Sequence, residues 1–126
     1  MSSPALFHLV PRNGPAIEAL QHVDNIPFVS PSAEGMPGLE IGFHVPPFSR
    51  GHVITRLGRK GDLILRESYS AVHVAFEVHP DTHLVVLSVR TKRVSSVTVQ
   101  LDEAEEEIPG DCALIYGRQY NINIAS

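Results

Sequence analysis

Between residues 58 and 73 the chain reads GRKGDLILRESYSAVH, and three side chains in this stretch suit molecular recognition. Arg59 offers a planar guanidinium that is always charged. Ser70 offers a hydroxyl, and His73 follows three residues later. Between the arginine and the serine, DLIL has the length and composition of a short strand. Because loops at the edges of a rigid β scaffold commonly carry binding groups, we expect this segment to form a recognition site.

The elements that must position these side chains are strands. Residues 39–45 (LEIGFHV) and 71–79 (AVHVAFEVH) place apolar residues at every second position, as half-buried strands do. Further strand patterns occupy residues 6–10, 53–57, 62–65, 83–89, 96–101, 112–116 and 120–124. About nine short strands, separated by Gly, Pro, Asp and Ser, predict an antiparallel β-sandwich or barrel.

Residues 11–38 interrupt this strand pattern. Proline and glycine are frequent there, so we expect a long irregular insertion after the first strand. Helical patterns are scarce and short: AIEALQHV at 16–23 is one, and the acidic run DEAEEE at 102–107 is the other.

Length and composition restrict the class of protein. With 126 residues, 43% of them hydrophobic and 19% charged, the sequence predicts one soluble domain over 1–126. No apolar run approaches the roughly 20 residues of a membrane span. The start of the chain lacks a secretory signal pattern, so we expect an intracellular protein without a membrane partner. Cys112 is the single cysteine, and we expect it to be a small buried hydrophobic residue.

The charge of the chain is low but uneven. A net charge of -4 argues against binding of duplex nucleic acid. Nine of the ten Lys and Arg residues lie at or after Arg50, whereas six of the fourteen acidic residues lie between Asp102 and Asp111. This distribution predicts a local basic patch, which suits one or two phosphates better than a polyanion.

The order of these motifs resembles the forkhead-associated (FHA) domain, a phosphopeptide-binding β-sandwich. The family pattern runs Gly-Arg, a short Asp-x-x-Leu strand, Ser-x-x-His and, before the last strands, Gly-Asp. The matching residues here are, in order, Gly58, Arg59, Asp62, Leu65, Ser70, His73, Gly110 and Asp111. The similarity covers residues 53–124 and implies an all-β fold, an FHA-like antiparallel β-sandwich of two sheets.

The resemblance implies a phosphothreonine-peptide recognition module in signalling, whose partner is a phosphorylated protein or peptide. Arg59 and Ser70 would be the primary phosphate ligands, with Lys60 at the rim of the pocket. Gly58 would support the site by allowing close backbone approach, and His73 would brace the loop by hydrogen bonds. No cofactor or metal is implied.

Two positions depart from the family pattern. Ala71 follows the motif serine, where the family often has Arg or Asn, and RTKRVSSV replaces the family's Asn-Gly-Thr loop. This replacement is basic and rich in hydroxyls, so we expect it to contact phosphate by a different route. The residues expected to do so are Arg90, Thr91, Lys92, Arg93, Ser95 and Ser96.

Other functions are open on the sequence alone. The chain can instead be a phosphate-independent β-sandwich that binds a partner or dimerises, including the N-terminal regulatory domain of a larger signalling protein such as a protein kinase. We do not expect an enzyme within these residues. The seven histidines include no His-x-His pair on a strand, and no Gly-x-Ser-x-Gly motif surrounds Ser70.

Overall fold

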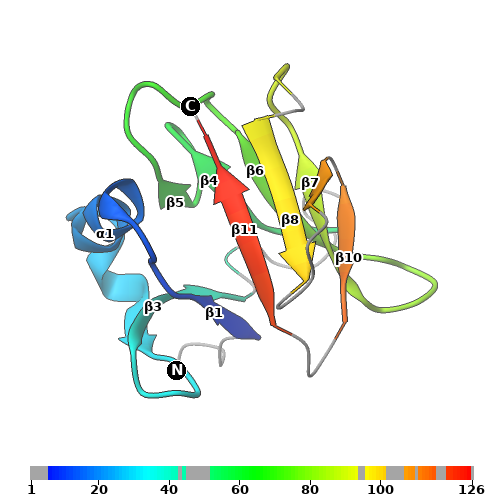
Figure 1. Ribbon diagram of the computed structural model, residues 1–126, viewed down its shortest axis with the longest axis horizontal. Helices are drawn as coiled ribbons and strands as arrows, with labels where there is room; N and C mark the ends of the chain where they lie inside the picture. The colour runs from blue at the N-terminus through cyan, green and yellow to red at the C-terminus, as the bar shows by residue number, and fades with distance from the viewer. Residues whose placement is uncertain are drawn as a thin grey trace.

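Apolar residues in alternation organise the chain into strands that share one core (Figure 1). The computed structural model describes residues 6–42, 44, 52–93, 96–101, 107–109, 111–115 and 119–125, with 101 and 107–109 described by their backbone only. In chain order the elements are β1 (Phe7–Leu9), α1 (Gly14–Gln21), the 3-10 helix η1 (Ile26–Phe28), β2 (Val29–Pro31), β3 (Pro37–Ile41), β4 (Val53–Gly58), β5 (Leu63–Ile64), β6 (Val74–Val78), β7 (Val85–Val89), β8 (Val97–Leu101), β9 (Glu107–Pro109), β10 (Cys112–Leu114) and β11 (Tyr120–Ile124).

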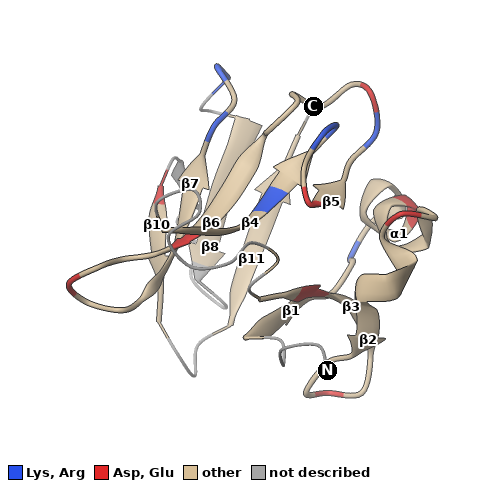
Figure 2. Cartoon of the chain, turned by 180° about the vertical axis from the view of Figure 1, so that it is seen from behind, with Lys and Arg blue, Asp and Glu red and all other residues tan. Residues whose placement is uncertain are grey.

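The described strands form three sheets, one more than the two expected, because β1 and the insertion build a sheet with β3. The largest has five strands in the order β10-β7-β6-β4-β5, in which β4 and β5 are parallel and the other neighbours antiparallel. An antiparallel sheet, β11-β8-β9, lies against it as a second layer: β8 and β11 are in front in Figure 1, and β4, β6 and β7 are in front in Figure 2. The third sheet, β1-β3-β2, lies at one end beside α1.

One apolar core joins the three sheets. Its fully buried side chains include Phe76 at the centre of β6, Val97 of β8 and Ile41 of β3. Full burial of a side chain of this kind stabilises a fold by about 1.5–3 kcal/mol. The period-two pattern placed two of these side chains, Ile41 and Phe76, on one face of their strands.

The expectation of a mostly β fold is confirmed. Each strand pattern within the described residues contains a strand, and β3 begins before the pattern at 39–45, of which residues 43 and 45 lie outside the described part. Strand β9 was not predicted; it begins at the end of the acidic run, of which residues 102–106 are not described. No helix among the described residues has the length and apolar character needed to cross a membrane.

Residues 11–38 are more regular than expected. Helix α1 covers Gly14–Gln21 rather than 16–23, because Asn13 caps it: the Asn13 side chain accepts the N–H of Ala16 at 3.0 Å. Pro15, in the first turn, suits a helix start. The helix ends before His22, whose backbone is extended. Strand β2 lies farther along the insertion and pairs with β3, so the insertion contributes a strand to the β1-β3-β2 sheet.

Asn25 attaches this insertion to the five-stranded sheet. Its side chain is fully buried; Oδ1 accepts the N–H of Ile64 at 2.7 Å, and Nδ2 donates to the carbonyl of Ile64 at 2.8 Å. The same Nδ2 donates to the carbonyl of Ala19 at 2.8 Å. The Asn25 side-chain amide thus forms hydrogen bonds with both the N–H and the C=O of Ile64 in β5, as a neighbouring strand would.

Candidate functional site

The turn after β4 carries Arg59 and Lys60, and Asp62 fixes its shape. The Asp62 carboxylate accepts the backbone N–H of Arg56 at 2.9 Å and lies 3.3 Å from the Arg56 Nε. The N–H of Asp62 donates to the Arg56 carbonyl at 2.8 Å. Gly61 closes the turn, where a Cβ would lie 2.5 Å from that carbonyl oxygen. These contacts hold two exposed cations on a defined backbone.

Gly58 allows the segment that contains Ser70 to approach the end of β4. A Cβ at Gly58 would lie 2.4 Å from the carbonyl oxygen of Ala71 and 2.8 Å from that of Ser70, so a side chain does not fit. The backbone N–H groups of Arg59 and Lys60 donate to the carbonyls of Ser70 and Ala71, each at 2.9 Å. The main chain therefore places Arg59 and Ser70 side by side.

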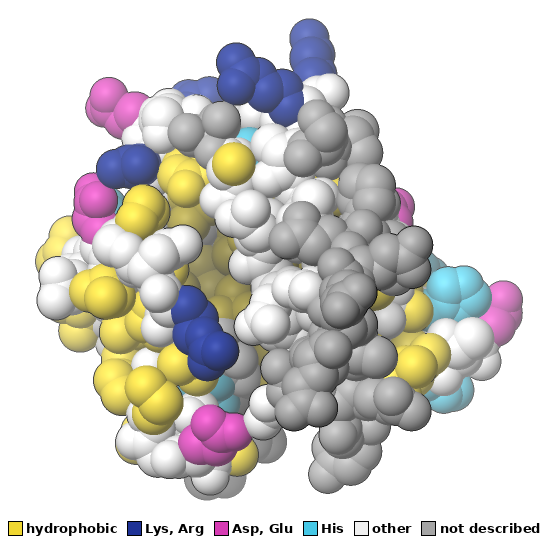
Figure 3. Space-filling model, in the orientation of Figure 1, with side chains coloured by type: hydrophobic (Ala, Val, Ile, Leu, Met, Phe, Trp, Pro, Cys, Tyr) yellow, Lys and Arg dark blue, Asp and Glu magenta, His cyan; other side chains and the backbone are white. Residues whose placement is uncertain are grey.

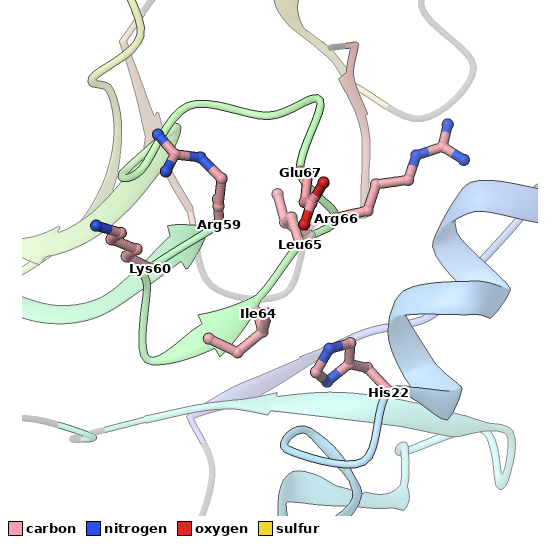
Figure 4. Close-up of a pocket in the computed structure, with 7 residues that line it drawn as sticks. All are labelled: His22, Arg59, Lys60, Ile64, Leu65, Arg66 and Glu67. Atoms are coloured by element: carbon pink, nitrogen blue, oxygen red, sulfur yellow. The ribbon is translucent and has the colours of Figure 1, made fainter.

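Arg59 and Lys60 lie at the rim of a shallow pocket (Figure 4). Arg59 is exposed, and its Nε donates to the carbonyl of Tyr69 at 3.3 Å, which directs the guanidinium along the turn. Arg66 lines the same pocket but extends toward α1, where its Nη1 lies 3.3 Å from a carboxylate oxygen of Glu18. The other lining residues are His22, Ile64, Leu65 and Glu67.

His73 links the Ser70 segment to the loop after β7. Its side chain is buried, and its Nδ1 accepts the N–H of Ser70 at 3.2 Å. The proton of the neutral ring therefore lies on Nε2, which donates to the hydroxyl of Ser96 at 3.2 Å. The Ser96 hydroxyl donates in turn to the carbonyl of Arg93 at 2.7 Å. One imidazole thus connects two segments of the site.

This role depends on a neutral ring. Burial lowers the pKa of His73 from its usual value of 6.5, and a backbone hydrogen bond at Ala125 opposes the shift only in part. A protonated ring would have a proton on Nδ1 and could not accept the N–H of Ser70.

The hydroxyls of Ser70 and Thr91 meet at the centre of the site. Their oxygens are 2.8 Å apart, and Thr91 is buried. The backbone N–H groups of Arg90 and Thr91 both donate to the carbonyl of His73, at 3.0 and 3.1 Å. The loop after β7 is therefore anchored beside Ser70 by its main chain as well as by a side chain.

The basic residues of this loop have different surroundings. Arg90, Lys92 and Arg93 are all exposed, and the Arg90 side chain forms an ion pair with Glu77 on the neighbouring strand β6. Figure 2 shows basic residues at the ends of β4 and β7 along the same edge of the molecule. Ser95, which was also expected to contribute, lies outside the described residues.

The structure therefore brings the described residues of the predicted site into one region of the molecule. The Ser70 and Thr91 hydroxyls are in contact, and the main chain of Arg59 lies beside Ser70. Gly58 and His73 hold the Ser70 segment, and Ser96 is bonded to His73. The exposed side chains of Lys60, Lys92 and Arg93 lie on the adjoining turn and loop. Arg90 is directed to Glu77 on the sheet. Tyr69, whose carbonyl orients Arg59, was not predicted, because a backbone acceptor leaves no signal in the residue type.

Two further observations concern metal binding and thiol chemistry in the described residues. These residues contain no group of three or more His, Cys, Asp and Glu side chains arranged to hold a metal ion. Cys112 is half-buried on β10, and burial raises the pKa of its thiol, which reduces its reactivity.

Comparison of the chain with protein-family models, with curated proteins and with solved structures finds no match.

Proposed function

We propose that this chain is an FHA-type β-sandwich that binds phosphothreonine peptides in signalling. Two contacts carry the proposal: the main chain of Arg59 bonds to that of Ser70 at 2.9 Å, and the Ser70 hydroxyl lies 2.8 Å from that of Thr91. Two layers of strands packed on a common core support the sandwich part of the proposal.

The chemistry of a phosphate matches these groups. A phosphothreonine carries about -1.5 to -2 charges at neutral pH and three acceptor oxygens. The guanidinium of Arg59 supplies paired N–H donors, and the hydroxyls of Ser70 and Thr91 can rotate their protons toward a phosphate oxygen. Lys60, Lys92 and Arg93 add positive potential around them. The side chain of Arg90 lies in a surface ion pair with Glu77, so part of its charge is already compensated.

A peptide library tests this function. Immobilised protein is exposed to degenerate phosphothreonine peptides, with phosphoserine and unphosphorylated libraries in parallel, and Arg59→Ala is compared with Arg12→Ala, an exposed arginine of the insertion that is not part of the site. We expect the wild type and Arg12→Ala to retain phosphothreonine peptides and Arg59→Ala to lose them. Retention of phosphothreonine and unphosphorylated peptides to the same extent by both the wild type and Arg59→Ala, or no retention by folded wild-type protein, would reject the proposal in favour of a phosphate-independent interaction module.

A further inference from the structure

A large apolar groove runs along β11, on the face seen in Figure 3. Strand β11 forms one wall, and β1 and α1 form the other; Leu39, Leu57 and Leu65 lie among its apolar lining residues. Its volume of about 1350 Å³ exceeds the roughly 300–1,000 Å³ of typical small-molecule pockets. Arg59, Ser70 and Thr91 are not among the described residues that line it.

The wall formed by β11 is a strand edge. Strand β11 pairs with β8 on one side, and in the described part of the chain no strand pairs with its other side. The N–H of Ala125 donates toward β8, to the carbonyl of Ser96 at 2.8 Å. Backbone groups of successive residues point to opposite sides of a strand, so those of Asn121 and Asn123 also face β8.

The intervening residues, Tyr120, Ile122 and Ile124, therefore direct their N–H and C=O groups toward the groove. One of these groups is already used, since the carbonyl of Ile124 accepts the hydroxyl of Tyr69 at 3.3 Å. The side chains of the same three residues are half-buried and pack against the core. Within the described residues, the groove thus combines a strand edge that has no strand partner with an apolar interior.

We propose that this edge binds an extended segment of a partner protein as an added strand. An unpaired strand edge selects an extended backbone, because only that conformation presents donors and acceptors at matching intervals. Side chains on one face of the added strand would enter the groove and contact its apolar lining residues. The partner segment is therefore one with apolar residues at alternate positions. This interaction goes beyond the phosphothreonine site and needs no phosphate.

Amide hydrogen exchange of the free protein provides the first test. We expect the N–H of Ile122 to exchange at least tenfold faster than those of Asn121 and Asn123, which face β8. Protection of the Ile122 amide equal to that of its neighbours would show that the edge is already paired and would overturn the proposal. Protection that increases with protein concentration would assign the edge to a second copy of this chain and would overturn it as well.

Peptide binding provides the second test. The probe is a library of unphosphorylated nonapeptides with Val, Ile, Leu or Phe at alternate central positions, Thr between them, and Lys at both ends. We expect the wild type and Arg59→Ala to retain members equally, and bound peptide to protect the Ile122 amide. N-methylation on the side of a retained peptide that faces β11 should weaken binding at least tenfold, and N-methylation on its other side should not.

A third test compares a variant that fills the groove with a matched variant outside it. Ala16 lines the groove, whereas Val23, just after the same helix, is 73% exposed and does not. We expect Ala16→Trp to lose peptide retention and Val23→Trp to keep it, with the unfolding temperature of each variant recorded. No retention by the wild type, or equal effects of N-methylation on both sides of the peptide, would overturn the proposal even if Ala16→Trp failed to fold.

Discussion

The imidazole of His73 accepts the backbone N–H of Ser70 at 3.2 Å, and the same ring donates to the hydroxyl of Ser96. The two sides of the proposed phosphate site are therefore joined through one buried, neutral histidine. Since acceptance through Nδ1 requires the neutral ring, the arrangement of the site is linked to pH.

We expect the stability of the fold to decrease in mildly acidic solution because of His73. Burial places its folded pKa below 6.5, so the unfolded chain takes up this proton more readily. The contribution of the neutral ring is complete above about pH 6.5 and is lost as the pH falls through the lowered folded pKa. The slope from one such group is at most about 1.4 kcal/mol per pH unit. Urea denaturation between pH 7.5 and 5 measures it.

The matched variants are His73→Gln and His79→Asn. His79 is exposed, and its Nδ1 accepts the N–H of Asp81 at 3.1 Å, a bond that an asparagine can imitate. We expect His73→Gln to flatten the pH dependence and His79→Asn to retain it. The same pH dependence in His73→Gln as in the wild type would disprove the role assigned to the imidazole.

Gly58→Ala should damage the site through its backbone. The new Cβ would lie 2.4 Å from the carbonyl oxygen of Ala71, so the Ser70 segment must move away from β4. Strain of this kind typically costs about 1–3 kcal/mol. We expect lower stability together with weaker phosphopeptide binding. Gly14→Ala is the control, because a Cβ there has no neighbour within 4 Å; equal stability of the two variants would contradict the close approach.

Asn25→Ala should detach the insertion from β5. The variant removes the hydrogen-bond partners of the Ile64 N–H and of the Ile64 C=O. Both backbone groups then lack these bonds, a loss of about 1–3 kcal/mol. We expect the amide of Ile64 to exchange faster with solvent and protease cleavage within 14–31 to increase. The control is Asn121→Ala, since that side chain is exposed. Unchanged exchange at Ile64 would show that the amide clamp is dispensable.

The sequence predicted the parts of the fold in which local pattern and burial agree. Val74 and Phe76 lie two residues apart on β6, and both are fully buried. The start of α1 was missed by two residues because the capping role of Asn13 was not recognised, although its residue type is a standard signal. Asn25 had no such signal, because its partner Ile64 lies 39 residues away in the sequence.

The candidate site was predictable in its residue types and less so in its pairings. Arg59, Ser70 and His73 lie close together in the sequence, and the fold keeps them together. The pairing of Ser70 with Thr91 crosses 21 residues, and the pairing of Arg90 with Glu77 depends on the register of β6 and β7. The register of paired strands determines which charged side chains lie close enough to form ion pairs. Composition alone does not specify this register.

The most direct test of phosphothreonine recognition is calorimetric titration of a phosphothreonine peptide recovered from the library into the wild type, Arg59→Ala and Arg12→Ala. Charge-assisted hydrogen bonds contribute about 1.5–3 kcal/mol, so loss of Arg59 should weaken binding roughly 10- to 100-fold. Arg12→Ala and the wild type should have the same affinity, and the unphosphorylated peptide should not bind measurably. Equal affinity of Arg59→Ala and the wild type would contradict the proposed phosphate site.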